Sequence, residues 1–301
     1  MSIAYLFPGQ GSQEVGMGRE LYEKKATVRA LFDEADALLG FSLSTLCFTG
    51  PEAALTDTVN QQPALFTTSM AMLMAVQAED APPPAFVAGH SMGELSALAA
   101  AGSLSFADGL RLARRRGELM AQAGERQPGA MAAILALDAA TVRQVCAEAS
   151  QQNGRSVQIA NDNCPGQIVI SGDKEALHEA VALAQAAGAR KVVLLPITIA
   201  AHSPLMASAS AEFAEAVANT PLKKPEIPII GNVSAQPLRT VAEIRAELEA
   251  QLTASVRWTE SMNYLVAQGV TRVMEIGPGD VLLSLMKRID RKVARVKFEA
   301  Q

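Results

Sequence analysis

VAGHSMGE at residues 87–94 indicates the fold class, because a short apolar strand runs directly into Gly-x-Ser-x-Gly and then into the helix-forming residues 95–101. This order predicts a nucleophile elbow, the strained strand-to-helix turn that lifts a serine hydroxyl out at the edge of a sheet. The glycines allow a tight turn, and the helix that follows offers free backbone N–H groups to an oxyanion. The alternative is a plain glycine-rich turn, since so short a pattern also arises by chance.

On both sides of this stretch, short β-branched runs alternate with longer, alanine-rich helical stretches, which is typical of an α/β fold with a largely parallel sheet. The predicted strands are residues 3–7, 86–89, 229–231 and 272–276, and the predicted helices include 106–123 and 241–252. The apolar run 63–76 is too short for a membrane span and contains three hydroxyl side chains, so we expect a buried core helix there.

Residues 127–198 form a different segment, which begins at the Pro128-Gly129 breaker. Its pattern predicts strands at 130–136, 157–161, 167–171 and 191–196, with helices at 141–151 and 174–187. That order favours a small ferredoxin-like domain. We therefore expect an α/β hydrolase-like large domain made of residues 1–126 and 199–301, interrupted by this insert, with the active site in the cleft between them.

The composition limits the possible partners and compartments. The 301 residues carry a net charge of −5, so the surface as a whole should repel nucleic acid and anionic membrane. Three cysteines without CxxC spacing argue against a disulfide framework and against a zinc site, which favours a reducing cytoplasm. A short apolar run at the start of the sequence is followed directly by Pro and Gly, which predicts a buried strand and not a signal peptide.

A serine becomes an effective nucleophile only when a base takes its proton, and histidine is the usual base at neutral pH. The chain has three histidines. His90 adjoins Ser91 and should point away from it along the turn, in a structural role. His178 lies in a polar helix and should be solvated, so elimination leaves His202, at a strand-to-helix junction, as the base.

The position of His202 departs from the α/β-hydrolase order, in which the histidine lies close to the C-terminus after a late acid. Here about a hundred residues still follow His202. This departure weakens a hydrolase interpretation, and it leaves open which group orients the imidazole.

Several further motifs accompany the elbow along the chain. They are FPGQGSQ at 7–13, GHSMGE at 89–94, RGELM at 116–120, NDNCPGQ at 161–167, HSPLM at 202–206, Gln251 with VRW at 256–258, and EIGPG at 275–279. Taken together, these motifs resemble the malonyl-CoA:acyl carrier protein transacylases, a family that includes the acyltransferase domains of polyketide synthases. The resemblance covers essentially the whole chain.

The resemblance implies a role for each motif residue. Ser91 would be the nucleophile, His202 the base, and the backbone N–H groups of Gln10 and Met92 the oxyanion hole. Arg116 would pair with the free carboxylate of a malonyl group, for which the forked guanidinium is suited. Of the consecutive Arg114, Arg115 and Arg116, only one can face the pocket, and a solvated basic face is the alternative for the others.

Three further positions follow from the same resemblance. The backbone carbonyl of Gln251 would accept a hydrogen bond from the histidine, which would replace the missing carboxylate. Asn161 would lie near the pocket, although asparagine in such a loop is also a simple turn former. Ala201 stands where many malonyl-selective polyketide relatives carry a bulky aromatic residue, so discrimination against an α-methyl group should be small.

We therefore expect an enzyme of fatty-acid synthesis that transfers a malonyl group from malonyl-CoA to the phosphopantetheine thiol of an acyl carrier protein, by a ping-pong mechanism. It should be a cytoplasmic monomer that binds no metal and no cofactor and uses the coenzyme A thioester as substrate. One alternative is a stand-alone polyketide acyltransferase. Alternatives of another class are a serine hydrolase or thioesterase and a noncatalytic carrier-binding module.

Overall fold

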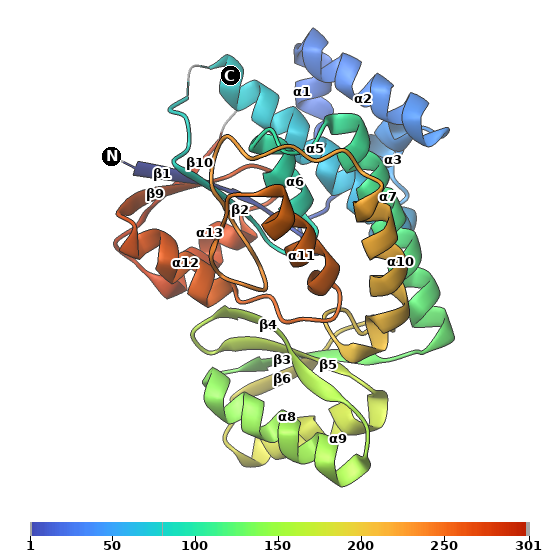
Figure 1. Ribbon diagram of the computed structural model, residues 1–301, viewed down its shortest axis with the longest axis vertical. Helices are drawn as coiled ribbons and strands as arrows, with labels where there is room; N and C mark the ends of the chain where they lie inside the picture. Colours follow the sequence, from blue (N-terminus) through green and yellow to red (C-terminus); the bar gives the residue numbers. More distant parts are fainter. Residues whose placement is uncertain (1, 80, 299–301) are drawn as a thin grey trace.

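A six-stranded sheet forms the centre of the computed structural model, which describes residues 2–79 and 81–298 (Figure 1). Its order is β10-β9-β1-β2-β7-β8, and every neighbouring pair is parallel except β7 and β8. The strands are β1 (Ser2–Phe7), β2 (Phe86–Gly89), β7 (Ile229–Ile230), β8 (Pro237–Leu238), β9 (Val270–Glu275) and β10 (Ala294–Lys297). The mixed α/β class predicted from the sequence is confirmed.

Alternation along the central strand β1 gives each face of this sheet its own core. Ile3, Tyr5 and Phe7 join the larger hydrophobic cluster, with α5 (Thr58–Ala78), α6 (Gly93–Ala100) and α7 (Phe106–Arg126). Ala4 and Leu6 join the cluster on the opposite face, with α12 (Trp258–Ala267) and α13 (Val281–Ile289). The sheet is therefore covered on both sides, as parallel sheets are.

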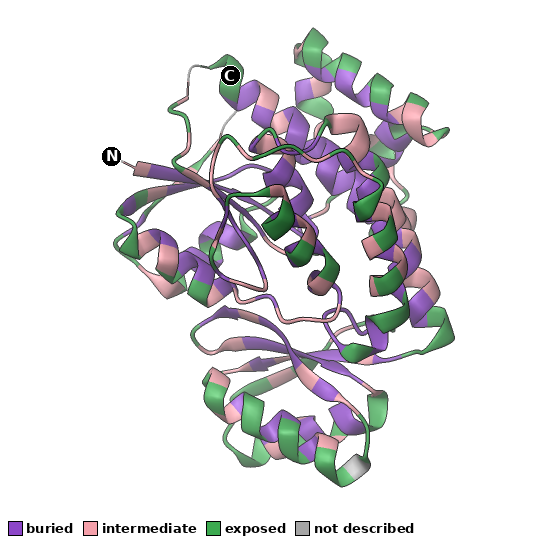
Figure 2. Cartoon of the chain, in the orientation of Figure 1, coloured by how far each residue is buried: buried purple, intermediate pink, exposed green. Residues whose placement is uncertain are grey.

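Helix α5 contains the apolar run 63–76 and is buried along most of its length, so the predicted core helix is confirmed (Figure 2). In the part of the chain that the structure describes, no helix combines the length and apolar character that crossing a membrane requires. Outside residues 127–198, the described chain also contains α1 (Arg19–Lys24), α2 (Ala26–Leu39), α3 (Leu43–Thr49), α4 (Glu52–Thr56), the 3-10 helix η1 (Pro204–Met206), α10 (Ala207–Ala218) and α11 (Val241–Gln251).

A second sheet is antiparallel, with the order β4-β5-β3-β6. Its strands are β3 (Ala130–Leu135), β4 (Val157–Cys164), β5 (Gln167–Gly172) and β6 (Lys191–Leu194), with α8 (Ala139–Asn153) and α9 (Lys174–Ala186) between them in sequence. Both helices pack on one face, and Met131 and Val169 on the other face join the larger cluster. In Figure 1 these strands lie between α8 and α9 and the rest of the molecule. The βαββαβ order and this strand order are ferredoxin-like, as predicted.

The two sheets are joined through strand β4 and the segment that links α11 to α12. Val256 donates its N–H to Ala160 O at 2.8 Å and accepts the N–H of Asp162 at 2.9 Å. Arg288, at the end of α13, donates to Gln167 Oε1 at 2.6 Å and to Pro165 O at 3.0 Å in the β4–β5 turn. These hydrogen bonds fix the position of the second sheet beside the carboxyl edge of the parallel strands.

Candidate active site

The nucleophile elbow forms between β2 and α6, as predicted. A Cβ built on Gly89 would lie 1.9 Å from Gly93 O, and one built on Gly93 would lie 2.2 Å from Phe7 O. Both positions therefore require glycine because backbone packs directly against backbone. Ser91 lies between them with φ 52°, in the left-handed region that costs a non-glycine residue energy.

Three hydrogen bonds hold the strained turn. The Ser91 N–H donates to Asn232 Oδ1 at 2.7 Å, and Asn232 Nδ2 donates to Gly89 O at 2.7 Å. On the other side, Gln251 Nε2 donates to Ser91 O at 3.1 Å. Asn232 follows β7 and Gln251 ends α11, so elements far apart in the sequence fix the conformation of this serine.

His202 lies within hydrogen-bond distance of the serine, with 2.8 Å between Ser91 Oγ and His202 Nε2. The other ring nitrogen, Nδ1, faces two backbone carbonyls, Gln251 O at 2.8 Å and Ala254 O at 3.1 Å. Since carbonyls only accept, Nδ1 must carry the proton, and Nε2 is left with a lone pair directed at Ser91. The arrangement suits proton transfer from the hydroxyl to the imidazole.

Burial keeps this imidazole neutral. Loss of solvation, followed by the positive charge of Arg116, lowers the pKa of His202 to about 3. The ring is therefore in its basic form throughout the neutral pH range.

Arg116 projects from α7 toward the same serine, and its side chain is 1 % exposed. Its Nη2 lies 3.1 Å from Ser91 Oγ, and its Nη1 donates to Gln62 Oε1 at 2.9 Å. Gln251 Oε1 accepts from Nη2 at 2.9 Å and from Nε at 3.1 Å. Burial lowers the pKa of Arg116 to about 10, so the group is still a cation at neutral pH.

No carboxylate of the described residues lies within ion-pair distance of Arg116. The two preceding arginines are paired elsewhere: Arg114 with Glu118 at 2.7 Å and Arg115 with Glu212 at 3.0 Å. A buried cation without a paired anion is costly, and an anionic ligand beside Ser91 would offset that cost.

A cavity of about 600 Å³ opens over Ser91 and His202. Gln10, Asn161 and Ala201 line it, together with the linker residues Leu195 to Ile197 and Ile199, which follow β6. Asn161 is a residue of strand β4 and not of a turn, and its side chain is 7 % exposed. The volume is that of a pocket for a small molecule.

Two backbone N–H groups remain available near the serine. Because β1 and β2 are parallel neighbours, the turns that follow them lie together, and His90 N donates to Phe7 O at 2.9 Å. Met92 stands at the N-cap of α6, and Gln10 lies in the turn after β1. Within residues 2–79 and 81–298, no acceptor is found for the N–H of Gln10 or of Met92.

The other two histidines lie as the sequence predicts. The His90 ring is 2.8 Å from Asn163 Oδ1 and packs edge-on against Trp258, with 5.3 Å between ring centroids, so its partner is Asn163 and not Ser91, although His90 also lines the cavity. Burial lowers its pKa. His178 is exposed on α9. Over the described residues there is no group of three or more His, Cys, Asp or Glu side chains placed to hold a metal ion.

Sequence reasoning missed three buried polar residues, Asn232, Gln62 and Glu94. Glu94 accepts from the N–H and the Nδ2 of Asn232 at 2.9 and 2.8 Å and also contacts Gln251 Nε2. Burial and the nearby Glu247 raise the pKa of Glu94 to about 8. One signal was available for Asn232, because it directly follows a predicted strand at the carboxyl edge of a parallel sheet, where sites form.

Comparison with known proteins assigns the family. Residues 4–300 match the profile of the acyl transferase domain. The malonyl CoA-acyl carrier protein transacylase of Bacillus subtilis (strain 168) is 47 % identical over 98 % of this chain and 92 % of its own length. That of Escherichia coli (strain K12) is 42 % identical over 95 % of this chain and 92 % of its own.

Solved structures agree with this assignment. The acyl carrier protein S-malonyltransferase of Vibrio cholerae has a TM-score of 0.97 at 40 % identity, covering 100 % of this chain and 98 % of that one. A malonyl-transacylase in complex with a type II polyketide synthase acyl-carrier protein has a TM-score of 0.96 at 37 % identity, covering 100 % of this chain and 97 % of that one. With a serine, a neutral histidine and a buried arginine gathered under one cavity, this chain therefore belongs to the acyl transferase domain family.

Proposed function

We propose that this chain transfers a malonyl group from malonyl-CoA to the phosphopantetheine thiol of an acyl carrier protein, through an ester on Ser91. One observation carries the proposal: the buried cation of Arg116 lies 3.1 Å from Ser91 Oγ, and no carboxylate of the described chain lies within ion-pair distance of it. Malonyl carries a free carboxylate next to its reacting thioester, so it supplies the missing anion at the required place.

In the first half-reaction, His202 Nε2 takes the proton of Ser91 Oγ as the oxygen attacks the thioester carbonyl carbon. The N–H groups of Gln10 and Met92 stabilise the carbonyl oxygen while it carries negative charge. The C–S bond then breaks, and the departing sulfur takes the proton from His202. Coenzyme A leaves as the thiol, and Ser91 carries the malonyl ester.

The second half-reaction reverses these steps with a different thiol. The phosphopantetheine sulfur gives its proton to His202 and attacks the ester carbonyl. The bond between that carbon and Ser91 Oγ breaks, and the oxygen recovers the proton from His202. The chemistry moves only protons and an acyl group, so we propose that it proceeds without a resident metal or cofactor.

Asn161 and Ala201 line the cavity and are proposed to contact the acyl group or its thioester arm. The proposed domain boundaries are those expected from the sequence, with residues 127–198 as the small domain above the site. The three cysteines of the chain are free and buried, which supports a reducing cytoplasm as its location. We also propose that the enzyme acts as a monomer, because every group used in the mechanism comes from one chain.

The pathway has a second candidate. The structural relative with its type II polyketide synthase carrier protein supports a polyketide role as well as fatty-acid synthesis. A hydrolase or thioesterase is less favoured, because a cation beside the nucleophile has no use for an uncharged acyl group, and because Gln251 O stands where a hydrolase places its acid.

Intact-mass measurement tests the proposal directly. The protein is mixed in turn with malonyl-CoA, acetyl-CoA and methylmalonyl-CoA, and the adduct is then challenged with carrier protein with and without its phosphopantetheine arm. We expect a malonyl adduct that Ser91→Ala abolishes and that only the phosphopantetheine form removes. A malonyl mass on the Ser91→Ala protein, or loss of the adduct to water alone, would contradict the proposal.

A further inference from the structure

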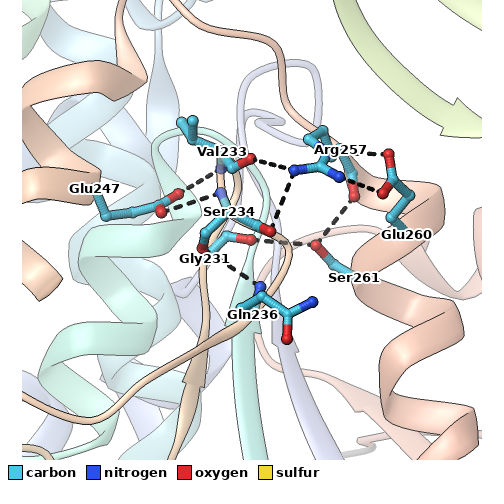
Figure 3. Close-up of polar contacts among 8 residues, drawn as sticks. All are labelled: Gly231, Val233, Ser234, Gln236, Glu247, Arg257, Glu260 and Ser261. Carbon is cyan, nitrogen blue, oxygen red and sulfur yellow. Dashed lines mark hydrogen bonds and ion pairs between the residues drawn. The ribbon is translucent and has the colours of Figure 1, made fainter.

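The loop between β7 and β8 is held from two opposite sides by charged residues (Figure 3). On one side, the carboxylate of Glu247, from α11, accepts the N–H of Val233 and, at 3.2 Å, that of Ser234. On the other side, Arg257 donates from Nη1 to the carbonyl oxygens of Val233 at 3.1 Å and Ser234 at 3.3 Å. We call Glu247 and Arg257 the loop clamp.

The two charges match the dipoles of the peptide groups between them. An anion lies at the N–H side and a cation at the C=O side, so each hydrogen bond is charge-assisted and about twice as strong as a neutral one. Glu247 is 5 % exposed, and in the described structure its carboxylate bonds only to this loop. Arg257 is fixed in turn by Glu260, which pairs with its Nε at 2.9 Å.

Packing removes the remaining freedom of the loop. A Cβ built on Gly231 would lie 2.6 Å from Glu247 Oε2, so the carboxylate occupies the space of a side chain. Gly231 also donates its N–H to Gln236 O at 3.0 Å and accepts from Ser261 Oγ at 3.2 Å. The position of the loop is therefore set by the clamp and by its neighbours together.

The residue between these contacts is Asn232, which connects the loop to the nucleophile elbow. Its Oδ1 accepts the Ser91 N–H at 2.7 Å, and its own N–H and Nδ2 reach Glu94. Because Ser91 adopts φ 52°, its backbone must be held in place by such contacts. Any displacement of the loop would move Asn232, and Ser91 with it.

From this chain of contacts we infer that Glu247 and Arg257 are positioning residues, which hold Ser91 Oγ in line with His202 through Asn232. Neither clamp residue lines the cavity or touches Ser91 or His202. The inference rests on the proposed function for the reaction it serves, but its readout does not need an acyl-CoA.

The readout is the rate at which a small fluorophosphonate labels Ser91, measured beside the rate of malonylation in a quenched-flow experiment. The variants are Glu247→Gln, Arg257→Gln and Gly231→Ala. Glutamine cannot accept both N–H groups, since its amide nitrogen would face one of them. We expect each variant to lose roughly 10- to 100-fold in labelling and in kcat, because misplacement by about 1 Å can cost 10²-fold, while the KM for malonyl-CoA changes little.

Two comparisons separate positioning from a general loss of structure. Glu249→Gln, two residues away on the exposed face of α11, is the matched control and should label at the parent rate. The double variant Glu247→Gln with Asn232→Ala should be no slower than Asn232→Ala alone, because both act through one contact. Circular dichroism and thermal melting identify variants that remain folded.

If Glu247→Gln fails to fold, Arg257→Lys still tests the inference, since lysine keeps the charge but loses the fork by which Nε and Nη2 bind Glu260 while Nη1 donates to both carbonyls. Labelling at the parent rate in folded Arg257→Gln and Arg257→Lys would overturn the inference, as would additive losses in the double variant. A parent protein that is labelled on Ser91 but takes no malonyl group would refute the proposed function and leave the clamp tested by the probe alone.

Discussion

At the scale of single residues, the two groups proposed to react share an unusual backbone conformation. Ser91 has φ 52° and His202 has φ 58°, both in the left-handed region. For a residue with a side chain this conformation costs about 1 to 2 kcal/mol. The surrounding hydrogen bonds keep both residues in this strained backbone conformation. The site therefore retains conformational energy that would be released if the backbone relaxed.

The strain at Ser91 predicts that glycine at this position gives a more stable protein than alanine does, which is the reverse of the usual order for these two residues. Ser91→Gly should be more stable than Ser91→Ala by about 1 kcal/mol, because glycine adopts positive φ without cost. Both variants lose the hydroxyl, so the comparison isolates the backbone. Urea unfolding of the two proteins measures the difference. Equal free energies of unfolding would mean that the turn relaxes when the hydroxyl is gone.

The pKa of His202 predicts the acid side of the pH profile. A pKa lowered to about 3 leaves the base unprotonated well below the ordinary value of 6.5. Labelling of Ser91 by a fluorophosphonate should therefore show no loss between pH 7 and pH 5.5. Because the folded state binds fewer protons than the unfolded state here, His202 should lower the stability of the protein as the pH falls through 6.5 toward 3. A loss of labelling centred near pH 6.5 would contradict the burial argument.

Arg116→Ala should lower the rate of malonyl transfer but not that of acetyl transfer. Malonyl transfer should fall by roughly 10²-fold or more, since a hydrogen-bonded charge is lost, while acetyl transfer should be spared or improved. Arg111→Ala, on the exposed side of the same helix, is the matched control. The measurement is kcat/KM for malonyl-CoA and acetyl-CoA. Equal losses for both would show that Arg116 supports the fold and not the substrate.

At the scale of elements, we propose that the C-terminal end of helix α11 orients His202, as an acidic residue does in a hydrolase. Gln251 is its last residue, and the final carbonyls of a helix lack partners within the helix. One of them accepts His202 Nδ1–H at 2.8 Å. The negative end of the helix dipole lies there as well, so it favours the imidazolium that forms during the reaction. In this proposal, the end of a helix replaces a buried carboxylate.

A substitution at the opposite end of α11 should change the free energy of unfolding without changing kcat. Thr240 and Glu243 form a capping box there, with Glu243 N donating to Thr240 Oγ1 at 3.2 Å. Thr240→Ala should lower the free energy of unfolding by about 1 kcal/mol. The kcat should change little, because Gln251 lies at the far end of the helix. A large loss of activity with unchanged stability would contradict this division of roles.

The sequence predicts those parts of the fold whose determining residues lie close together in the chain. Ser105 caps α7 as expected, accepting the N–H of Asp108 at 3.1 Å, because the signal lies within four residues. The helices between residues 19 and 56 were not predicted. Three of them, α1, α3 and α4, have only 6, 7 and 5 residues, and such short helices are stabilised by packing more than by local sequence.

The same distinction applies to the site. The elbow and the small number of histidines indicated Ser91 and His202. Asn232 contacts Ser91 across 141 positions of the chain, and the carbonyl of Gln251 contacts His202 across 49. Gln62 holds Arg116 across 54 positions. No periodicity or spacing reports such contacts, and only the resemblance to a family indicated the role of Gln251.

At the scale of the whole molecule, the distribution of charge matters for the proposed carrier protein. Carrier proteins of this kind are acidic, whereas this chain has a net charge of −5, so docking requires a local basic patch. The C-terminal end of α13 and the residues after it offer Lys287, Arg291 and Lys292, beside the β4–β5 turn that Arg288 contacts. Arg288 itself joins the two sheets and is left out of the test.

Charge reversal of this patch should weaken docking. Lys287→Glu with Arg291→Glu should raise the KM for carrier protein several-fold at low salt and leave the KM for malonyl-CoA unchanged. Added salt should raise the parent KM toward that of the variant. Arg19→Glu with Lys24→Glu, both exposed on α1, makes the same change in net charge and serves as the control. A carrier-protein KM that neither salt nor the reversal changes would exclude this patch.

The placement of β1 at the centre of the large sheet determines when the enzyme can first act during its synthesis. Tyr5 pairs with Val87 on one side and with Met274 on the other. The edge of β1 that pairs with β9 therefore stays unpaired until residues 270–275 have been translated. The antiparallel sheet pairs only residues between 130 and 194 and can close while the ribosome is still working. An unfinished chain therefore holds a completed insert inside an open sheet. We therefore expect acyl transfer to begin only after β9 has paired with β1.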